Sequence, residues 1–245
     1  MKPIYKTLLW LTLFSIAMGY LETAVVVYLR NLLYAGGFEF PLVPVSNNIA
    51  VTEFWREVAT IVMLLGAGII AGRNGAQKFV FFLYCFAVWD IFYYVFLYVL
   101  LGWPESLFTW DILFLIPVPW VGPVIAPCLV ASTMILLALL TVWFQERGRS
   151  GVTNWTERLL LIGGSLVIMA SFMWDYFKYV QANPSAKGMW TLSSDTQLFS
   201  EAAQYIPRDF NWALFWCGEL ILLGALALFT MRMRKEGAAR TVIAA

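Results

Sequence analysis

The sequence predicts an all-α, polytopic integral membrane protein that crosses the bilayer six times. Of its 245 residues, 61% are hydrophobic and 13% are charged, whereas about 25% of the residues of a soluble domain are charged. Six apolar stretches are each long enough to span about 30 Å of hydrocarbon as a helix, and lipid tolerates no open backbone structure in their place. They form a single transmembrane domain with spans at residues 7–33, 51–72, 79–101, 123–144, 159–180 and 210–231.

The first span follows Lys2 and Lys6 and includes Ala17-Met18-Gly19, a small-residue pattern found at signal-peptide cleavage sites. The apolar run continues beyond that pattern through Val25–Leu29. We therefore expect an uncleaved first helix.

Basic residues in the connections divide unevenly between the two sides of this arrangement. Eleven of the sixteen Lys and Arg residues fall on the side of the chain ends, and short cytoplasmic loops carry an excess of basic residues. We therefore expect a multi-pass protein of the inner membrane with both termini in the cytoplasm. The eleven residues are Lys2, Lys6, Arg73, Lys78, Arg147, Arg149, Arg158, Arg232, Arg234, Lys235 and Arg240.

The connection between the third and fourth spans is apolar but rich in proline. Thr109 is a candidate N-cap for a short helix over residues 110–116. Because irregular backbone at membrane depth must be covered by protein, we expect a re-entrant segment or an amphipathic helix at the membrane interface. The start of the fourth helix near Gly122 would favour an anion such as Asp111 beside it. The polar connection 181–209 is expected to cover the outer mouth of the bundle. The proline residues are Pro117, Pro119, Pro123 and Pro127.

Three carboxylates lie deepest in the spans. At 1.5 Å per residue, Asp90 lies about 16 Å along the third span and Glu219 about 13 Å along the sixth, and Glu22 lies somewhat nearer the outer face. A charge at a helix centre costs about 2.5–3.5 kcal/mol, so these residues are candidates for function. We expect the polar side chains to converge on an outward-facing acidic cavity. Further charges near the outer end are Arg30, Glu53, Arg56, Glu57, Asp175 and Lys178.

Three charged residues near the start of the second span share one helix face, because they are spaced i, i+3 and i+4. We interpret Glu53 as an acid that favours the positive end of its helix. Arg56 and Glu57 lie deeper and are expected to pair across helices, Arg56 with Glu22.

A short sequence pattern, W-D-x-F-x-Y-V, occurs at residues 89–95 and again at residues 174–180. Both spans run from inside to outside, so the pattern predicts an internal duplication with a site between the two copies. A plain interfacial salt bridge between Asp175 and Lys178 is the competing interpretation. In each copy the carboxylate and a phenol are spaced for an i, i+4 hydrogen bond: Asp90 with Tyr94, and Asp175 with Tyr179.

The chain has no histidine, which removes the commonest ligand of haem and zinc and excludes a Ser-His-Asp triad. The sixth span has no lysine for a retinal Schiff base, so we expect no haem, zinc or retinal to be ligated by this chain. The carboxylates can instead hold a proton, an organic cation beside aromatic rings, or Ca²⁺, Mg²⁺ or Mn²⁺. The candidate metal ligands are Glu57, Asp90, Asp175 and Glu219, within a candidate ligand or ion site of Glu22, Arg56, Glu57, Asp90, Tyr94, Asp175, Tyr179 and Glu219.

These residues predict a protein that binds or translocates a proton, a metal cation or a cationic small molecule. Two alternatives stay open. One is an accessory subunit of a larger redox or photosynthetic membrane complex. The other is a membrane-embedded enzyme that uses carboxylates or a metal on a lipid-like substrate, which the short inner connections favour less. The expected partners are membrane lipids and other membrane subunits, and not nucleic acid.

Overall fold

The computed structural model describes residues 4–34, 37–38, 40–41, 43, 46–114, 119–182 and 205–243. Within these residues, six helices are long and apolar enough to cross a membrane, as predicted. The chain is therefore an all-α, multi-pass membrane protein. The helices are α1 (Ile4–Leu33), α2 (Asn47–Ala71), α3 (Gly75–Leu101), α4 (Ile125–Glu146), α5 (Trp155–Ala182) and α7 (Trp212–Ile243).

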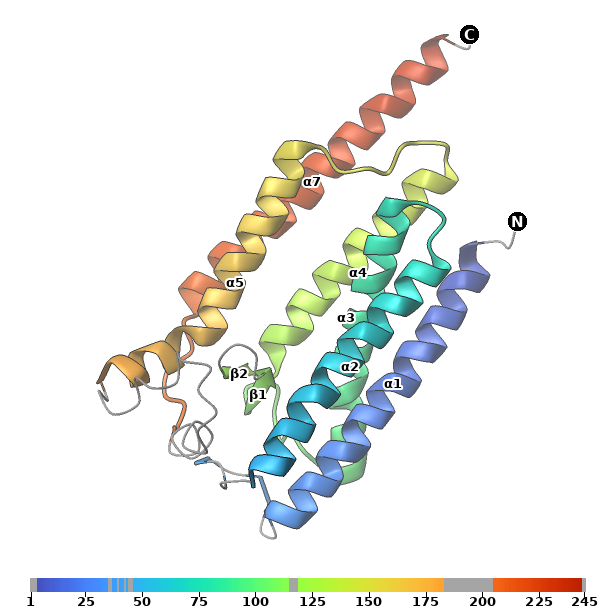
Figure 1. Ribbon diagram of the computed structural model, residues 1–245. Helices are drawn as coiled ribbons and strands as arrows, with labels where there is room; N and C mark the ends of the chain where they lie inside the picture. Colours follow the sequence, from blue (N-terminus) through green and yellow to red (C-terminus); the bar gives the residue numbers. More distant parts are fainter. Residues whose placement is uncertain are drawn as a thin grey trace.

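The helices lie side by side, and both chain ends are at the same end of the bundle (Figure 1). This arrangement follows from an even number of crossings. Helix α3 packs against α1, α2 and α4, whereas α5 packs mainly against α7, and α4 joins the two groups through α7. Helices α3 and α5 run in the same direction (Figure 1). The predicted internal duplication of these two helices requires this common direction.

The ends of α3 show how local sequence sets a helix boundary. The side chain of Asn74 accepts a hydrogen bond from the backbone N–H of Gln77 at 3.0 Å, which satisfies one of the free donors of the first turn. At the other end, Gly102 has a φ of +65°, a conformation that favours glycine because it has no Cβ. The bilayer-spanning length of α3, and with it the depth of Asp90, is therefore fixed at both ends.

Helices α5 and α7 approach each other closely at a pair of glycines. A Cβ atom on Gly164 would lie 3.0 Å from the backbone oxygen of Gly218, and a Cβ on Gly218 would lie 2.9 Å from the backbone oxygen of Gly164. Small residues of this kind let transmembrane helices approach closely. At the end nearest the chain termini, Glu157 of α5 also forms an ion pair with Arg232 of α7 at 2.7 Å.

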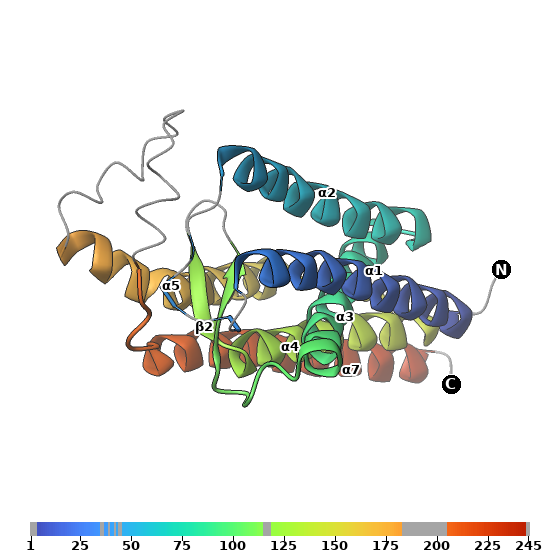
Figure 2. The same ribbon diagram turned by 90° about the horizontal axis from the view of Figure 1, so that it is seen from below.

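The prediction of a short helix at residues 110–116 is wrong in secondary structure. Trp110–Phe114 forms strand β1, which pairs antiparallel with β2 (Trp120–Pro123), so that Asp111 lies opposite Gly122. Trp120–Pro123 supplies a pairing partner for this segment, and the pairing satisfies backbone donors and acceptors of both strands. The hairpin lies between α5 and the end of α1 (Figure 2). The sequence predicts a proline-rich segment between α3 and α4, and the structure shows strands in this segment.

Gly122 allows the hairpin to lie close to the helices. A Cβ atom there would be 3.1 Å from a ring carbon of Phe210 and 3.3 Å from one of Phe172. The neighbouring Val121 is almost completely buried, at 1% exposure. Most of the predicted cover of the outer mouth, residues 183–204 of the connection 181–209, lies outside the described residues.

Candidate functional site

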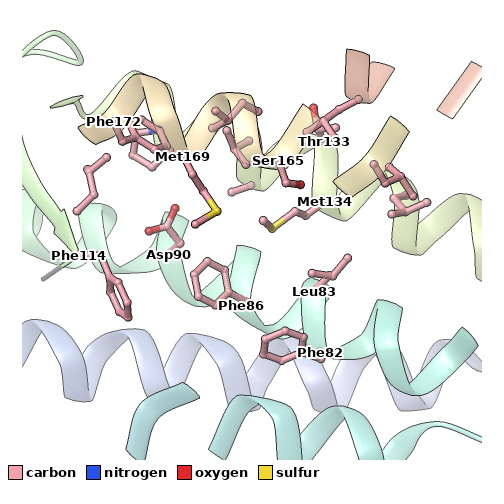
Figure 3. A pocket seen from close by; sticks show the side chains of 18 of the residues that line it. Phe82, Leu83, Phe86, Asp90, Phe114, Thr133, Met134, Ser165, Met169 and Phe172 are labelled. Atoms are coloured by element: carbon pink, nitrogen blue, oxygen red, sulfur yellow. The ribbon is translucent and has the colours of Figure 1, made fainter. Parts of the chain in front are cut away.

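A pocket of about 660 Å³ lies within the membrane-spanning part of the bundle. Its walls are formed mainly by α3, α4 and α5. One residue of α2, two residues of α7 and three residues of the β-hairpin also line it. Most of its lining is aromatic or aliphatic (Figure 3). The polar side chains that line it are those of Asp90, Thr133 and Ser165, together with the indoles of Trp89 and Trp120.

Asp90 of α3 directs its carboxylate into this pocket (Figure 3). Among the described residues, no group donates a hydrogen bond to this carboxylate and no Lys or Arg forms an ion pair with it. A buried charge without a partner is costly in an apolar medium. The geometry therefore leaves the Asp90 carboxylate available to a proton or to a cation that enters the pocket.

The pocket has a second carboxylate behind its wall. Thr133 of α4 lines the pocket, and its hydroxyl hydrogen bonds to Oε1 of Glu219 on α7. Glu219 is 3% exposed, and its Oε2 has no hydrogen-bond partner in the described part of the chain. Thr133 thus separates Glu219 from the pocket while holding it in place.

The pairing of Arg56 with Glu22 is confirmed. The Arg56 guanidinium bridges Glu22 of α1 and Glu53 of α2, and its Nε is 2.8 Å from Oε2 of Glu53. Thr60 adds a weak contact to Glu22 at 3.5 Å. Glu53 therefore pairs with Arg56 as well as lying near its helix start. None of these side chains lines the pocket, and their contacts join α1 to α2.

Asp111 pairs with Arg30, a contact that the sequence does not predict. Nη2 of Arg30 lies 3.5 Å from Oδ1 of Asp111, and both residues are at least nine-tenths buried. The guanidinium also lies over the ring of Trp103, 3.8 Å from its centroid, in a cation–π contact. The expectation placed Asp111 only at the start of the fourth helix, whereas its ionic partner comes from the end of the first.

The surroundings of Asp111 set its ionisation. Burial raises the pKa of Asp111 to about 6, and the charge of Arg30, the backbone N–H of Ile112 and the hydroxyl of Tyr94 hold it from rising further. Tyr94 is 6% exposed and lies on α3. It faces Asp111 on the hairpin, and the predicted hydrogen bond between Asp90 and Tyr94 is not formed.

Asp175, the counterpart of Asp90 in the repeated pattern, has a different environment. Its Oδ2 accepts hydrogen bonds from the Tyr205 hydroxyl at 2.6 Å and from the backbone N–H of Arg208 at 3.0 Å. Burial and the neighbouring Asp175 carboxylate raise the pKa of Tyr205, so the phenol stays protonated and donates. Asp175 forms no salt bridge with Lys178 within 4 Å. Tyr179 instead packs against the ring of Tyr205, with centroids 5.2 Å apart.

The structure does not bring the predicted metal ligands together. Asp90 faces the pocket, Asp175 binds the segment that leads into α7, and Glu219 binds Thr133. Glu57 lies on α2, whose only residue at the pocket is Ile61. Throughout the part of the chain that the structure describes, no three His, Cys, Asp or Glu side chains lie close enough to hold a metal ion.

Sequence reasoning missed most of the pocket. The methionines and aromatic residues that line the pocket are of the same types as residues that face lipid. Only the position of Asp90 in a span therefore indicated a pocket. The signal for Thr133 was a hydroxyl in an apolar span, which on its own is common. The chain matches none of the protein-family models, curated proteins or solved structures with which we compared it.

Proposed function

We propose that the protein binds, within the membrane, a largely apolar molecule that carries a cationic group, and that Asp90 is the counter-ion of that group. The observation that carries this proposal is a single unpaired carboxylate, among the described residues, directed into an otherwise apolar pocket. A cation in the pocket would form an ion pair with Asp90. This pair would offset the free-energy cost of an unpaired carboxylate in apolar surroundings.

The size and lining of the pocket support an organic ligand. Ligand pockets commonly measure about 300–1,000 Å³ and are mainly apolar with few polar groups, and this pocket measures about 660 Å³. Phe86, Trp89 and Trp120 line the pocket, and aromatic rings attract cations. Met134 and Met169 supply flexible, polarisable walls that adapt to the shape of a ligand.

A bare metal ion fits the pocket less well than an organic cation does. Calcium takes about 6–8 oxygen ligands and magnesium about six. Among the described residues, one carboxylate and two hydroxyls line the pocket. We therefore narrow the predicted cargo to a cationic small molecule, bound or carried through this pocket.

We also propose that the protein lies in the inner membrane with both termini in the cytoplasm. The basis is the excess of Lys and Arg in the connections on the side of the chain ends. Fusions of a cytoplasm-active and a periplasm-active reporter to each terminus test this orientation. Activity of the cytoplasmic reporter at both ends is expected, and activity of the periplasmic reporter at either end would contradict it.

Two probes of the same shape and opposite charge test the binding proposal. We expect the purified protein to bind tetraphenylphosphonium more tightly than tetraphenylborate, because Asp90 attracts the cation and repels the anion. Asp90→Asn should weaken phosphonium binding by about tenfold or more, equivalent to about 1.4 kcal/mol, and should leave borate binding unchanged or improved.

Glu105→Gln is the matched control, because it removes the same charge from an exposed residue outside the pocket. This variant should bind both probes as the wild type does. Equal phosphonium affinity in the wild type and Asp90→Asn would refute Asp90 as the counter-ion. An absence of phosphonium binding by the wild type would refute a site for lipophilic cations.

A further inference from the structure

Aromatic rings line the hairpin end of the pocket. Phe114 and Trp120 of the hairpin line it there, together with Phe172 of α5. Trp120 stacks on Phe172 with ring centroids 6.3 Å apart, and Trp120 also contacts Phe114 edge-on at 5.7 Å. These rings separate Asp90 from the end of the bundle opposite the chain termini.

The pocket is open along its side. Three of its lining residues are also more than half exposed: Phe79 at 56%, Ile162 at 58% and Leu166 at 57%. Phe79 lies near the start of α3, and Ile162 and Leu166 lie in the first half of α5. These side chains are apolar and belong to helices long and apolar enough to cross a membrane. We therefore expect lipid in front of the opening.

The opening and the Asp90 carboxylate lie at different ends of the pocket. Phe79 and Asp90 are both on α3, and eleven residues of helix rise by about 16 Å. The three exposed residues lie in the first halves of α3 and α5, and Asp90 lies near Phe114 of the hairpin (Figure 3). An elongated molecule with its charge at Asp90 would extend its apolar part towards the opening.

We infer that the ligand of this pocket is a cationic amphiphile dissolved in the bilayer, which reaches Asp90 sideways through the gap between α3 and α5. The inference rests on the proposed function, because it concerns the same ligand and the same carboxylate. It adds the route and the ligand class: the molecule partitions into lipid before it binds. A strongly hydrated cation that stays in water would meet the aromatic rings at the hairpin end.

Blocking the opening tests the route without touching the charge. The double variant Ile162→Trp with Leu166→Trp adds bulk at the opening, and both positions face lipid, so the fold should accept the larger rings. We expect the association and dissociation rates of tetraphenylphosphonium, measured in nanodiscs, each to fall by about fivefold or more. Phe79→Ala widens the opening and should raise both rates.

Leu220→Trp is the matched control, since Leu220 is 64% exposed on α7 and does not line the pocket. Its rates should equal those of the wild type. Unchanged rates in the blocked variant, together with retained Asp90-dependent binding, would overturn the lateral route and leave the proposed function standing. A change in the dissociation rate alone would also overturn it, because the new rings would then be contacting the ligand. Equal phosphonium affinity in the wild type and Asp90→Asn would overturn both proposals.

Discussion

Arg30 of α1 and Asp111 of the β-hairpin form a buried ion pair, with Nη2 and Oδ1 3.5 Å apart. The pair joins two segments that are about eighty residues apart in sequence, and it fixes the hairpin at the end of the bundle where aromatic rings line the pocket. It is not fully satisfied: Nη1 of Arg30 and Oδ2 of Asp111 have no hydrogen-bond partner among the described residues. Desolvation is therefore only partly offset, which is why the pKa of Asp111 rises despite the nearby cation.

This shift predicts a pH dependence of stability. The pKa of Asp111 rises from 3.8 to about 6 on folding, so between these pH values the folded protein binds more protons than the unfolded chain. The contribution of Asp111 to stability is then greatest below pH 4, falls as the pH rises to about 6 and is constant above. The total change is roughly 3 kcal/mol.

Thermal unfolding in detergent measures this contribution as the difference between wild type and Asp111→Asn. Other carboxylates titrate in the same range, and taking the difference removes the contribution of those that do not interact with Asp111. We expect the wild type to lose stability relative to the variant as the pH rises from 4 to 6. A gain over this range would mean that Arg30 outweighs burial.

The Glu22–Arg56–Glu53 cluster predicts an asymmetry between two neutralising substitutions. In Glu22→Gln, Arg56 keeps Glu53 as a partner. In Arg56→Gln, two partly buried carboxylates lose their cation together. Breaking a buried pair from one side costs about 3 kcal/mol or more, so Arg56→Gln should lower the free energy of unfolding by about that amount, whereas Glu22→Gln should cost about 1 kcal/mol.

Unfolding by mixed detergent titration checks the ranking, and the double variant of Glu22→Gln with Arg56→Gln supplies the control. It should be more stable than Arg56→Gln alone, because one of the two stranded carboxylates is removed. If Glu22→Gln proves the more damaging single change, Glu53 does not hold Arg56.

The sequence was sufficient for the spans and for the pairing of Arg56 with Glu22. Span length follows from bilayer thickness and hydropathy, which are properties of composition. A charged side chain in a span needs a partner at similar depth. Few acidic residues lie at the depth of Arg56, so the sequence indicates Glu22 as its partner.

The hairpin and its ion pair required information that is absent from local sequence. The apolar run at residues 110–116 fits a strand and a helix equally by composition, and only pairing with residues 120–123 decides between them. The pairing of the two strands places Asp111 beside Arg30. The pocket was equally hidden, because a Leu or Phe that faces a cavity cannot be distinguished by type from one that faces lipid. The pattern shared by residues 89–95 and 174–180 stays a prediction of duplication, although Asp90 and Asp175 have different partners.

The hydrogen bond between Tyr205 and Asp175 predicts a measurable anchoring contribution. Tyr205 is 2% exposed and its hydroxyl lies 2.6 Å from Oδ2 of Asp175. Hydrogen bonds to charged groups contribute about 1.5–3 kcal/mol, so Tyr205→Phe should lower the free energy of unfolding within that range, measured by thermal unfolding in detergent. Tyr28→Phe, at a residue that is 65% exposed on α1, should have no effect. Equal stability of the two variants would show that the backbone donors of residues 208 and 209 hold Asp175 unaided.

The close contact of α5 with α7 predicts different effects for a glycine inside the contact, Gly218, and a glycine outside it, Gly163. A Cβ on Gly218 would lie 2.7 Å from Cγ1 of Ile168 and 2.9 Å from the backbone oxygen of Gly164, so Gly218→Ala must push the helices apart. Overpacking of this kind costs about 1–3 kcal/mol. Gly163 has no atom within 4 Å of its Cβ position, so Gly163→Ala should be neutral or should stabilise by up to about 1 kcal/mol through helix propensity. Melting temperatures of the two variants in one detergent decide the matter: a Gly218→Ala protein as stable as Gly163→Ala would mean that α5 and α7 are not held at the distance the structure shows.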